Sequence, residues 1–449
     1  MDQSMRSTLA RFAASGDLHE VTREVDAQFE LGAVLSLRGR GQTQLFRNVR
    51  GHALPVVGNV LNTRDKIAAG LGLERRAVQS AIMAALERGL APEIVAGGPA
   101  QQVVIHAPDL VAELPVPRWF EREGGPYITA GVIVAKDPLS GRRNISIARL
   151  RLEGGDRLMA GIAPTHHLAE LLRRAQAQGR SLEIAVAIGN HPAVLLASQM
   201  YIELGHDEYD VAGALLGEPL RLARCATVDL EVPAEAEIVL EGTLHGDQLI
   251  DEGLVSEFPG FYVRYGAGLG VQIRAMTRRS DAIYQAIAPG YEPEHLLLGG
   301  TAIGATTCRA LRRVIPAVRE VLLTEGGMGR LHAVITMHQP KRGEGKRAIL
   351  LAMGTVNLLK LVIVVDDDID PDDWRQVEWA LAARMRGERD LIVIPGVKAD
   401  RCEPQEDDLT VTKIGIVATT RPGDGDGRFV YASAPDSILE RVRADLGTY

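Results

Sequence analysis

Arg149, Glu252 and Glu257 are the residues of this sequence whose types and spacing could do acid–base chemistry. Residues 144–150 alternate as a strand would, and this places Arg149 on a face with isoleucines. A guanidinium is charged at any ordinary pH, and a buried charge is costly unless it is paired, so we expect carboxylates nearby. The two glutamates, five positions apart, flank a turn-prone segment. The pattern predicts an arginine–carboxylate cluster, and spacing alone does not distinguish a structural ion pair from a reactive site.

A second candidate set combines an amide, an imidazole and a carboxylate: Asn144, His167 and Glu208. Oxygen-rich ligand sets without thiolates suit Mn²⁺ or Mg²⁺, particularly beside a phosphate. The long separations form no local metal motif, and each residue also has a simple structural interpretation. Asn144 could satisfy backbone groups, His167 could start a helix, and Glu208 could lie in solvent. The residues themselves therefore leave a metal site open.

Three regions must position these residues, because 449 residues exceed what one hydrophobic core usually serves. Residues 1–115 alternate helix and strand, with strands expected at 33–37 and 54–57, and predict a supporting α/β domain. Residues 116–300 contain many short β-prone runs with glycine turns, which indicates a barrel or a sandwich-like sheet. Strands are expected there at 132–135, 144–150, 182–188 and 236–240, and helices at 167–177 and 209–216.

Residues 301–449 alternate apolar runs with helices, which predicts a parallel, doubly wound α/β sheet. The apolar runs, expected to be strands buried on both faces, are 334–337, 361–365 and 391–394, and the helices are 305–314, 343–353 and 373–385. No GxGxxG follows the first strand, so a dinucleotide fingerprint is missing. Residues 421–428 are expected to form a surface loop before a terminal helix.

Composition excludes several classes of function. A net charge of -8 gives no general affinity for nucleic acid or anionic lipid. Three cysteines without CxxC spacing suggest neither a disulfide framework nor a thiolate zinc site. No apolar run approaches the roughly 20 residues that span a bilayer, and no signal peptide is visible, so we expect a cytoplasmic protein.

The motif Asn-x-Ser-Ile-x-Arg at 144–149, followed by Glu-Gly-x-x-x-Glu at 252–257, resembles the UbiD family of reversible decarboxylases, which use prenylated FMN. The resemblance extends over nearly the whole chain, in three further fragments whose order and spacing are specific together: Gly16-Asp17-Leu18 with Glu24-Val25-Asp26, Val232 to Glu237, and Val364 to Asp370. It implies a mixed α/β multidomain fold whose central domain is a split β-barrel of the flavin-reductase type.

The resemblance also assigns site residues. It implies that Asn144, His167 and Glu208 bind Mn²⁺ or Mg²⁺, which holds the flavin phosphate, and His166 leaves a one-residue ambiguity that we resolve for His167 on spacing. An associated K⁺ site would involve Ala197, Ser198 and Met200. The expected cofactor-binding residues are Asn144, Ser146, Ile147, Arg149, His167, Met200, Glu208 and Lys360, of which the last could equally be a solvated lysine. The acidic run 366–368 is interpreted as turn and capping chemistry.

By the same resemblance, Glu257 is the proton donor and Glu252 and Arg149 tune it. Protonating a carbanion-like centre after carbon dioxide leaves requires an acid with a pKa near neutrality. Arginine alone would make a glutamate too acidic, whereas a second carboxylate and partial desolvation act in the opposite direction. The three groups would titrate as a coupled set. Residues 254–256 depart from the Pro, aromatic and Gly common in the family, so the shape of this loop stays open.

We therefore expect a UbiD-like carboxy-lyase that acts on an aromatic, heteroaromatic or α,β-unsaturated carboxylic acid, releases or fixes carbon dioxide, and obtains its cofactor from a flavin prenyltransferase. A homodimer or larger assembly is expected through the C-terminal domain. Ile303 stands where relatives often carry arginine, which favours a monocarboxylic substrate, although Arg309, Arg312 or Arg313 could supply a clamp. The alternatives are an FMN- or NAD-dependent oxidoreductase on the same barrel, disfavoured by the missing fingerprint, and a non-catalytic assembly protein, disfavoured by the retained site residues.

Overall fold

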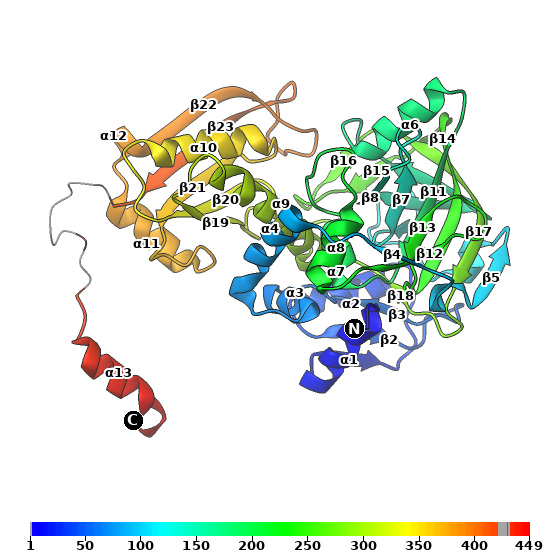
Figure 1. Ribbon diagram of the computed structural model, residues 1–449, viewed down its shortest axis with the longest axis horizontal. Coiled ribbons are helices and arrows are strands. Elements are labelled where there is room, and N and C mark those ends of the chain that lie inside the picture. The colour runs from blue at the N-terminus through cyan, green and yellow to red at the C-terminus, as the bar shows by residue number, and fades with distance from the viewer. Residues whose placement is uncertain (1, 421–428, 430–431) are drawn as a thin grey trace.

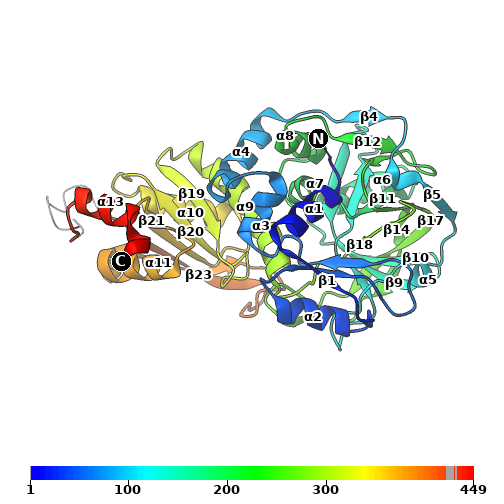
Figure 2. The ribbon, with the colours of Figure 1, turned by 90° about the horizontal axis from the view of Figure 1, so that it is seen from below.

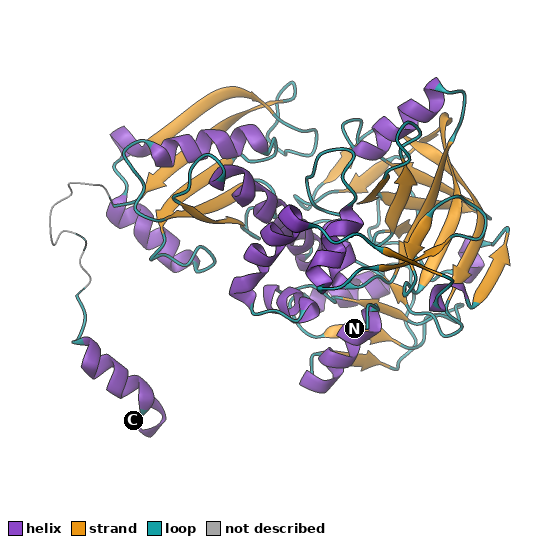
Figure 3. Cartoon of the chain, in the orientation of Figure 1, coloured by secondary structure: helices purple, strands orange, loops and turns teal. Residues whose placement is uncertain are grey.

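The computed structural model describes residues 2–420, 429 and 432–449 (Figure 1). Two bodies that contain β-sheets lie on either side of a group of helices (Figure 3). The helices of this group contact one another and are α3 (Arg64–Leu71), α4 (Val78–Arg88), α7 (Pro192–Ala197), α8 (Glu208–Leu216) and α9 (Pro293–Arg312). Because α9 runs without a break through residue 300, one helix connects the central part of the chain to the C-terminal body.

The N-terminal part of the chain forms a small sheet that it cannot complete alone. Its elements are α1 (Met5–Ser15), β1 (Leu18–Val21), α2 (Glu30–Arg38), β2 (Thr43–Phe46) and β3 (Val56–Gly58). The sheet order is β1-β2-β3-β18, and β18 (Tyr284–Gln285) comes from far along the sequence. The predicted strand at 33–37 is wrong. It lies in α2, because Leu31 and Leu35, one helical turn apart, are buried together while Leu37 is exposed.

A nine-stranded sheet forms the central part, in the order β6-β9-β10-β17-β14-β11-β7-β8, with β5 also paired to β17. Its strands are β5 (Val103–His106), β6 (Tyr127–Ile128), β7 (Val132–Lys136), β8 (Arg143–Ile147), β9 (Arg149–Gly154), β10 (Arg157–Gly161), β11 (Leu182–Ile188), β14 (Ile238–Asp251) and β17 (Ala267–Arg278). The smaller elements around it are β4 (Glu93–Val95), η2 (Pro99–Gln101), α5 (Leu110–Glu113), α6 (His167–Ala177), β12 (Arg221–Arg224), β13 (Glu231–Pro233), β15 (Leu254–Ser256) and β16 (Tyr262–Arg264), whereas η1 (Arg75–Ala77) contacts α3 and α4.

Ala148 separates two strands where the sequence predicted one. β8 ends at Ile147 and pairs with β7, whereas β9 begins at Arg149 and pairs with β6 and β10. These two strands stand near opposite ends of the sheet order, yet a single residue joins them. The sheet must therefore curl until its ends approach, although no ladder among the described residues pairs β8 with β9 and closes it. This bend places Asn144 and Arg149 near one seam of the curled sheet.

The C-terminal body is a five-stranded sheet with helices on both faces (Figure 2). Its elements are β19 (Val318–Leu323), β20 (His332–Met337), α10 (Glu344–Thr355), β21 (Leu361–Asp366), α11 (Trp374–Arg384), α12 (Gly387–Asp390), β22 (Leu391–Lys398) and β23 (Thr410–Ala418). Only β20, β21 and β23 run parallel, and both edge strands, β19 and β22, are antiparallel. The prediction of an all-parallel sheet is wrong at these edges.

Burial explains which apolar runs were interpreted correctly. β20 and β21 are buried on both faces, between α9 and α10 on one side and α11 on the other. β22 alternates, with Leu391 and Val393 exposed, because it is an edge strand. The terminal helix α13 (Asp436–Ala444) has no buried residue and is followed by η3 (Leu446–Thr448). The loop expected at 421–428 lies outside the described residues, and no described helix combines the length and apolar character that a membrane crossing requires.

Candidate active site

The structure brings Arg149, Glu252 and Glu257 together. Arg149 opens β9, Glu252 follows β14, and Glu257 follows the short strand β15. The guanidinium donates from Nε and Nη2 to the two carboxylate oxygens of Glu252 at 2.5 and 2.7 Å, and Nη1 lies 3.4 Å from Oε1 of Glu257. The Glu252 side chain is 2% exposed and that of Glu257 15%. Glu252 therefore forms a bidentate ion pair with Arg149, and Glu257 makes a single, longer contact with it.

The surroundings shift the pKa values of Glu257 and Arg149. Burial raises the pKa of Glu257, while Arg149 and the side chain of Tyr265 oppose the rise. Burial disfavours the charged guanidinium, yet the carboxylates keep the pKa of Arg149 above its usual value. The Arg149 guanidinium also lies over the Tyr265 ring, 4.8 Å from its centroid. A glutamate whose pKa is raised by burial, beside a fixed positive charge, is suited to give a proton to a negative centre.

Gly161 makes room for this ion pair, and nothing in the sequence pattern pointed to it. It is the partner of Arg149 in the β9–β10 ladder. A Cβ at Gly161 would lie 2.7 Å from Nε of Arg149 and 2.8 Å from Oε1 of Glu252. The position therefore requires glycine for close approach rather than for an unusual backbone angle.

Two buried side chains fix the segment that carries the glutamates. Arg151 donates to the carbonyl oxygens of Glu252 and Asp251 at 2.6 and 3.0 Å. Glu123, buried with its pKa raised by burial, accepts at Oε1 from the backbone N–H and the hydroxyl of Ser256 at 3.1 and 2.8 Å. The predicted turn at 254–256 is in fact the strand β15, paired with β16. Neither Arg151 nor Glu123 stood out in the sequence, because each lies far along the chain from Glu252 and Glu257.

Asn144 and Glu208 also meet. The Asn144 amide donates to Oε1 of Glu208 at 2.7 Å, and the backbone N–H of Ile145 donates to Oε2 at 2.9 Å. Burial raises the pKa of Glu208 to about 8. The amide oxygen of Asn144 and the hydroxyl of Ser146, two positions along β8, are buried without a hydrogen-bond partner. Such orphaned oxygens on one face of a strand fit a ligand that supplies a cation or a donor.

The two histidines stand at the start of α6, which packs against β8. His166 is the residue before the helix, its Nδ1 is buried without a partner, and burial lowers its pKa to about 4. His167 is the first helical residue, and burial lowers its pKa as well. Among the described residues no three His, Cys, Asp or Glu side chains converge as a metal set. The predicted set has only two side chains of these types, because its third ligand is the amide of Asn144.

The other predicted positions are distributed around this region. Ala197 ends α7, Ser198 donates to the carbonyl of Leu195 at 2.7 Å, and Met200 is buried in the same core as the partly buried Ile147. Lys360, before β21, pairs with Glu403 at 2.7 Å. The acidic run 366–368, which begins at the last residue of β21, holds the buried Arg384, whose Nη1 lies 2.8 Å from Asp366.

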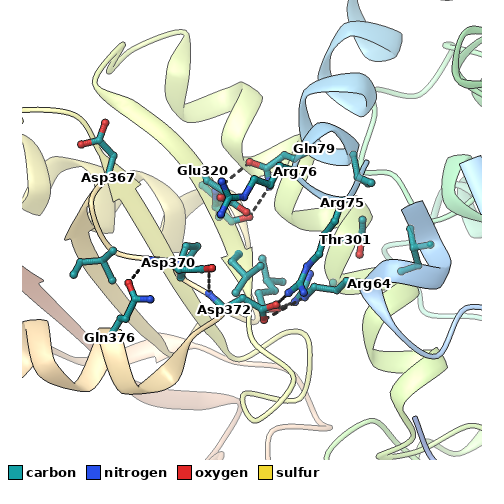
Figure 4. Close-up of a pocket in the computed structure, with 18 of the residues that line it drawn as sticks. Arg64, Arg75, Arg76, Gln79, Thr301, Glu320, Asp367, Asp370, Asp372 and Gln376 are labelled. Atoms are coloured by element: carbon teal, nitrogen blue, oxygen red, sulfur yellow. Dashed lines mark hydrogen bonds and ion pairs between the residues drawn. The ribbon is translucent and has the colours of Figure 1, made fainter. Parts of the chain in front are cut away.

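Two cavities lie away from Arg149. One of about 580 Å³ separates α3 and α4 from β19 and the loop after β21 (Figure 4). Arg64 and Arg75 both pair with Asp372 there, and Gln79 donates to the carbonyl of Val321 at 2.8 Å. Arg64 and Arg75 are therefore engaged across the junction between the two bodies. The other, of about 680 Å³, is lined by α4, α8 and the C-terminal half of α9.

Taken together, the fold and the site define a multidomain α/β protein with a largely buried cluster of one arginine and two glutamates, and a strand that carries two unpaired oxygens. Three family models match in succession: the 3-octaprenyl-4-hydroxybenzoate carboxy-lyase N-terminal domain at 9–86, its Rift-related domain at 93–292 and its C-terminal domain at 296–418. The chain belongs to the UbiD family of carboxy-lyases. The resemblance inferred from the motifs is confirmed.

Relatives in sequence and in structure agree with this membership. The anhydromevalonate phosphate decarboxylase of Methanothermobacter thermautotrophicus is 38% identical over 89% of this chain and 93% of that protein. The UbiD-class enzyme HmfF from Pelotomaculum thermopropionicum in complex with FMN is 40% identical, with a TM-score of 0.93 over 98% of this chain and 99% of that chain. An evolved dimeric form of HmfF in complex with prFMN is 39% identical, with a TM-score of 0.89 over 97% and 98% of the two chains.

Proposed function

We propose that this protein is a prenylated-FMN-dependent reversible decarboxylase of an aromatic, heteroaromatic or α,β-unsaturated carboxylic acid, with Glu257 as its proton donor. The observation that carries the proposal is that the two glutamates share Arg149 unequally. Glu252 accepts two hydrogen bonds from the guanidinium, and Glu257 makes one longer contact with it. Similar chains that bind FMN or prFMN, and a relative named a decarboxylase, support the same reaction class.

Arg149, Glu252 and Glu257 have different roles in the proposed reaction. The Arg149 guanidinium can hold the substrate carboxylate, because Glu252 already fixes its orientation and compensates its charge. Glu257, whose pKa is raised by burial, donates the proton of its carboxyl group to the carbon that loses carbon dioxide. In the carboxylation direction the same carboxylate removes that proton. The short strand β15 and the contacts of Ser256 keep this carboxyl in place.

The residues around β8 fit a flavin phosphate and its metal. The unpartnered oxygen of Asn144 and the carboxylate of Glu208 are suitable ligands for Mn²⁺ or Mg²⁺, with His167 or its neighbour His166 as the nitrogen ligand. Ser146, Ile147, Met200 and Lys360 complete the proposed cofactor set, and Ala197, Ser198 and Met200 the proposed K⁺ site. When bound, prenylated FMN would supply the electron sink for decarboxylation.

The organisation around the catalytic unit follows from the same proposal. A flavin prenyltransferase would deliver the cofactor in the cytoplasm, and the chain would assemble as a homodimer or larger oligomer through its C-terminal body. A dimeric form is known for the evolved HmfF. We keep the division at 1–115, 116–300 and 301–449 as a functional one, with α9 as the connection between the last two parts.

The test is to produce the protein with and without a flavin prenyltransferase and to measure three properties. These are the absorbance spectrum and intact mass of the released cofactor, the bound metal, and carbon dioxide release from a panel of unsaturated and aromatic acids. Prenylated FMN with acid-dependent carbon dioxide release is the expected result. Unmodified FMN with substrate-dependent oxidation would favour the oxidoreductase, and absence of cofactor from both preparations would favour an assembly protein.

A further inference from the structure

Tyr265 lies against the acid–base cluster and contacts two arginines at once. The Arg149 guanidinium lies 4.8 Å from the centroid of its ring, and the Arg401 guanidinium also lies 4.8 Å from that centroid. Arg149 belongs to the central sheet, whereas Arg401 belongs to the connection between β22 and β23 in the C-terminal body. At this ring a charge of the C-terminal body therefore comes close to the arginine of the site.

The backbone at Tyr265 is fixed from two directions. Tyr265 and Gly266 separate β16 from β17, opposite the short segment that separates β14 from β15. The backbone N–H of Glu252 donates to the carbonyl oxygen of Gly266 at 3.0 Å, and Gly266 has a φ of +104°, which favours glycine. Arg401 donates from Nη1 to the carbonyl oxygen of Tyr265 at 2.8 Å. The position of Tyr265 thus depends both on the segment that carries Glu252 and on the C-terminal body.

The side chain of Tyr265 is half-buried and packs against two apolar clusters. One is the core of the curled sheet. The other is a small cluster of Phe258, Leu296, Leu331 and Cys402. Phe258 directly follows the proposed proton donor, and Cys402 comes from the β22–β23 connection. The ring therefore packs between the sheet that carries the site and residues of the C-terminal body.

The hydroxyl of Tyr265 can act as a hydrogen-bond donor beside Glu257. Burial and the negative charge of Glu257 raise the pKa of Tyr265, so the hydroxyl keeps its proton at ordinary pH. Burial also raises the pKa of Glu257, and the hydrogen-bonding interaction with the Tyr265 side chain, like the charge of Arg149, opposes that rise. A donor to a carboxylate favours its ionised form. Removal of this hydroxyl should therefore make Glu257 less acidic.

Charged and titratable side chains face Glu257 from five parts of the chain. They are Arg149 at the start of β9, Glu252 after β14, Tyr265 before β17, Arg330 before β20 and Cys402 after β22. The arginines carry a positive charge at any ordinary pH. Burial raises the pKa of the Cys402 thiol, which is therefore neutral. In this set, Tyr265→Phe removes one interaction with Glu257 and changes neither a charge nor a ring.

We propose that Tyr265 is a positioning residue of the acid–base cluster and that Arg401 holds it in place from the C-terminal body. The proposal rests on the proposed function, in which Glu257 donates the proton. Glu252 binds the edge of the Arg149 guanidinium, and the Tyr265 ring attracts the same guanidinium through its π-electrons. Without the ring, Arg149 could turn toward Glu257 and form a second close pair. Without the hydroxyl, the Glu257 carboxyl would lose a hydrogen-bonding partner.

The first experiment compares pH profiles of the holoenzyme. kcat for carbon dioxide release is measured over a pH series for the wild type, Tyr265→Phe and Tyr262→Phe. Protonated Glu257 is the active form in decarboxylation, so kcat falls as the pH rises through its pKa. We expect Tyr265→Phe to move this alkaline limb to higher pH by about one pH unit, because a hydrogen bond to a charged group is lost.

Tyr262→Phe is the matched control for the loss of a hydroxyl. Tyr262 lies three positions earlier, and its hydroxyl lies 3.3 Å from the backbone nitrogen of Arg122, which donates to it. This substitution should leave the alkaline limb where it is in the wild type. An unmoved limb in Tyr265→Phe, or an equal displacement in Tyr262→Phe, would overturn the proposal.

Arg401 is tested separately, because it is exposed and its loss should leave folding intact. Arg401→Met should lower kcat/KM by about threefold to tenfold and move the limb in the same direction as Tyr265→Phe, by a smaller step. Arg401→Lys keeps a cation for the ring and should recover part of the loss. Arg264→Met is the control, since Arg264 is an exposed arginine beside Tyr265 that pairs with the exposed Asp251. Equal effects of Arg401→Met and Arg264→Met would overturn the role of Arg401.

Infrared spectroscopy gives a readout that does not depend on turnover. The carbonyl band of the protonated Glu257 carboxyl is identified by its absence from Glu257→Gln, and its disappearance is followed over the same pH series. We expect the midpoint to lie about one pH unit higher in Tyr265→Phe than in the wild type. Equal midpoints would overturn the proposal. If no acid is decarboxylated but the midpoint moves, the proposed reaction fails while the role of Tyr265 toward Glu257 stands.

Discussion

Glu252 binds Arg149 through both of its carboxylate oxygens, at 2.5 and 2.7 Å, and so determines how the guanidinium faces Glu257. If the two glutamates shared the arginine equally, both would be held ionised and neither could serve as an acid near neutral pH. In the proposed mechanism the unequal arrangement leaves Glu252 as the counter-ion of Arg149 and Glu257 as the proton donor. Substitutions of the two residues should therefore have different consequences.

Glu257→Gln should lower turnover by about a hundredfold to ten-thousandfold, the range usual for loss of a general acid. Its folding stability should change little, because Arg149 keeps its pair with Glu252. Glu252→Gln should instead cost about 3 kcal/mol of unfolding free energy, since it breaks a pair whose carboxylate is almost fully buried. Urea unfolding, the spectrum of bound cofactor and carbon dioxide release measure these effects. Undiminished turnover of cofactor-loaded Glu257→Gln would remove Glu257 from the mechanism.

Ser256 should act on the reaction through Glu123. Ser256→Ala removes the hydroxyl that donates to Glu123 at 2.8 Å and leaves that buried carboxylate with fewer donors. We expect a loss of about 1–3 kcal/mol in unfolding free energy and a reduced kcat with nearly unchanged KM, because Glu257, the next residue, loses its fixed position. Ser256→Thr keeps the hydroxyl and is the matched control. A stability loss in Ser256→Ala without any change in kcat would show that this contact serves the fold alone.

The sequence predicted correctly those elements whose conformation is determined by residues close to them along the chain. α6 has the predicted bounds, His167–Ala177, and β11 has the bounds Leu182–Ile188 because its apolar run is bounded by turn residues. The motifs around Arg149 and Glu252 identified the family, and the predicted arginine–carboxylate pairing is present in the structure. What these elements share is that their neighbours along the chain determine their conformation.

Long-range packing explains what sequence reasoning missed. The break at Ala148 depends on the curling of the whole sheet, and the residues 144–150 alternate as one strand would. β22 looked like an interior strand, because an apolar run does not reveal its position in the sheet order. Gly161 gave no signal in the sequence, because its closeness to Arg149 and Glu252 becomes visible only when β9 and β10 pair.

Substitutions at 166 and 167 should decide which imidazole serves the proposed metal. We expect His167→Ala and Glu208→Ala to lose bound Mn²⁺ and flavin together, because ligands of one ion act as a unit. Elemental analysis and flavin absorbance of the purified proteins measure both losses. His166→Ala is the control. It is a stringent control, because the Nδ1 of His166 is buried without a hydrogen-bond partner and is therefore the competing candidate ligand. Loss in His166→Ala alone would move the site by one residue, and normal Mn²⁺ in all variants would exclude the ligand set.

Glu208 should make the stability of the metal-free, cofactor-free protein depend on pH. Burial raises the pKa of its carboxyl to about 8, whereas an unfolded glutamate titrates near about 4.3. Between these values the folded protein holds a proton that the unfolded chain has released, so raising the pH favours unfolding. The free energy of unfolding should fall by up to about 1.4 kcal/mol per pH unit across this window, and this group should contribute no further loss above it.

Glu208→Gln cannot titrate and serves as the comparison. Its unfolding free energy is expected to be lower at acidic pH, because an amide nitrogen would face the Ile145 N–H, but to vary less between pH 5 and 8. Urea unfolding at a series of pH values gives both curves. Mn²⁺ added to the wild type should reduce the slope, since a bound cation favours the ionised carboxylate. Parallel curves for the wild type and Glu208→Gln would show that Glu208 is already ionised in the folded protein and that its burial is compensated by other groups.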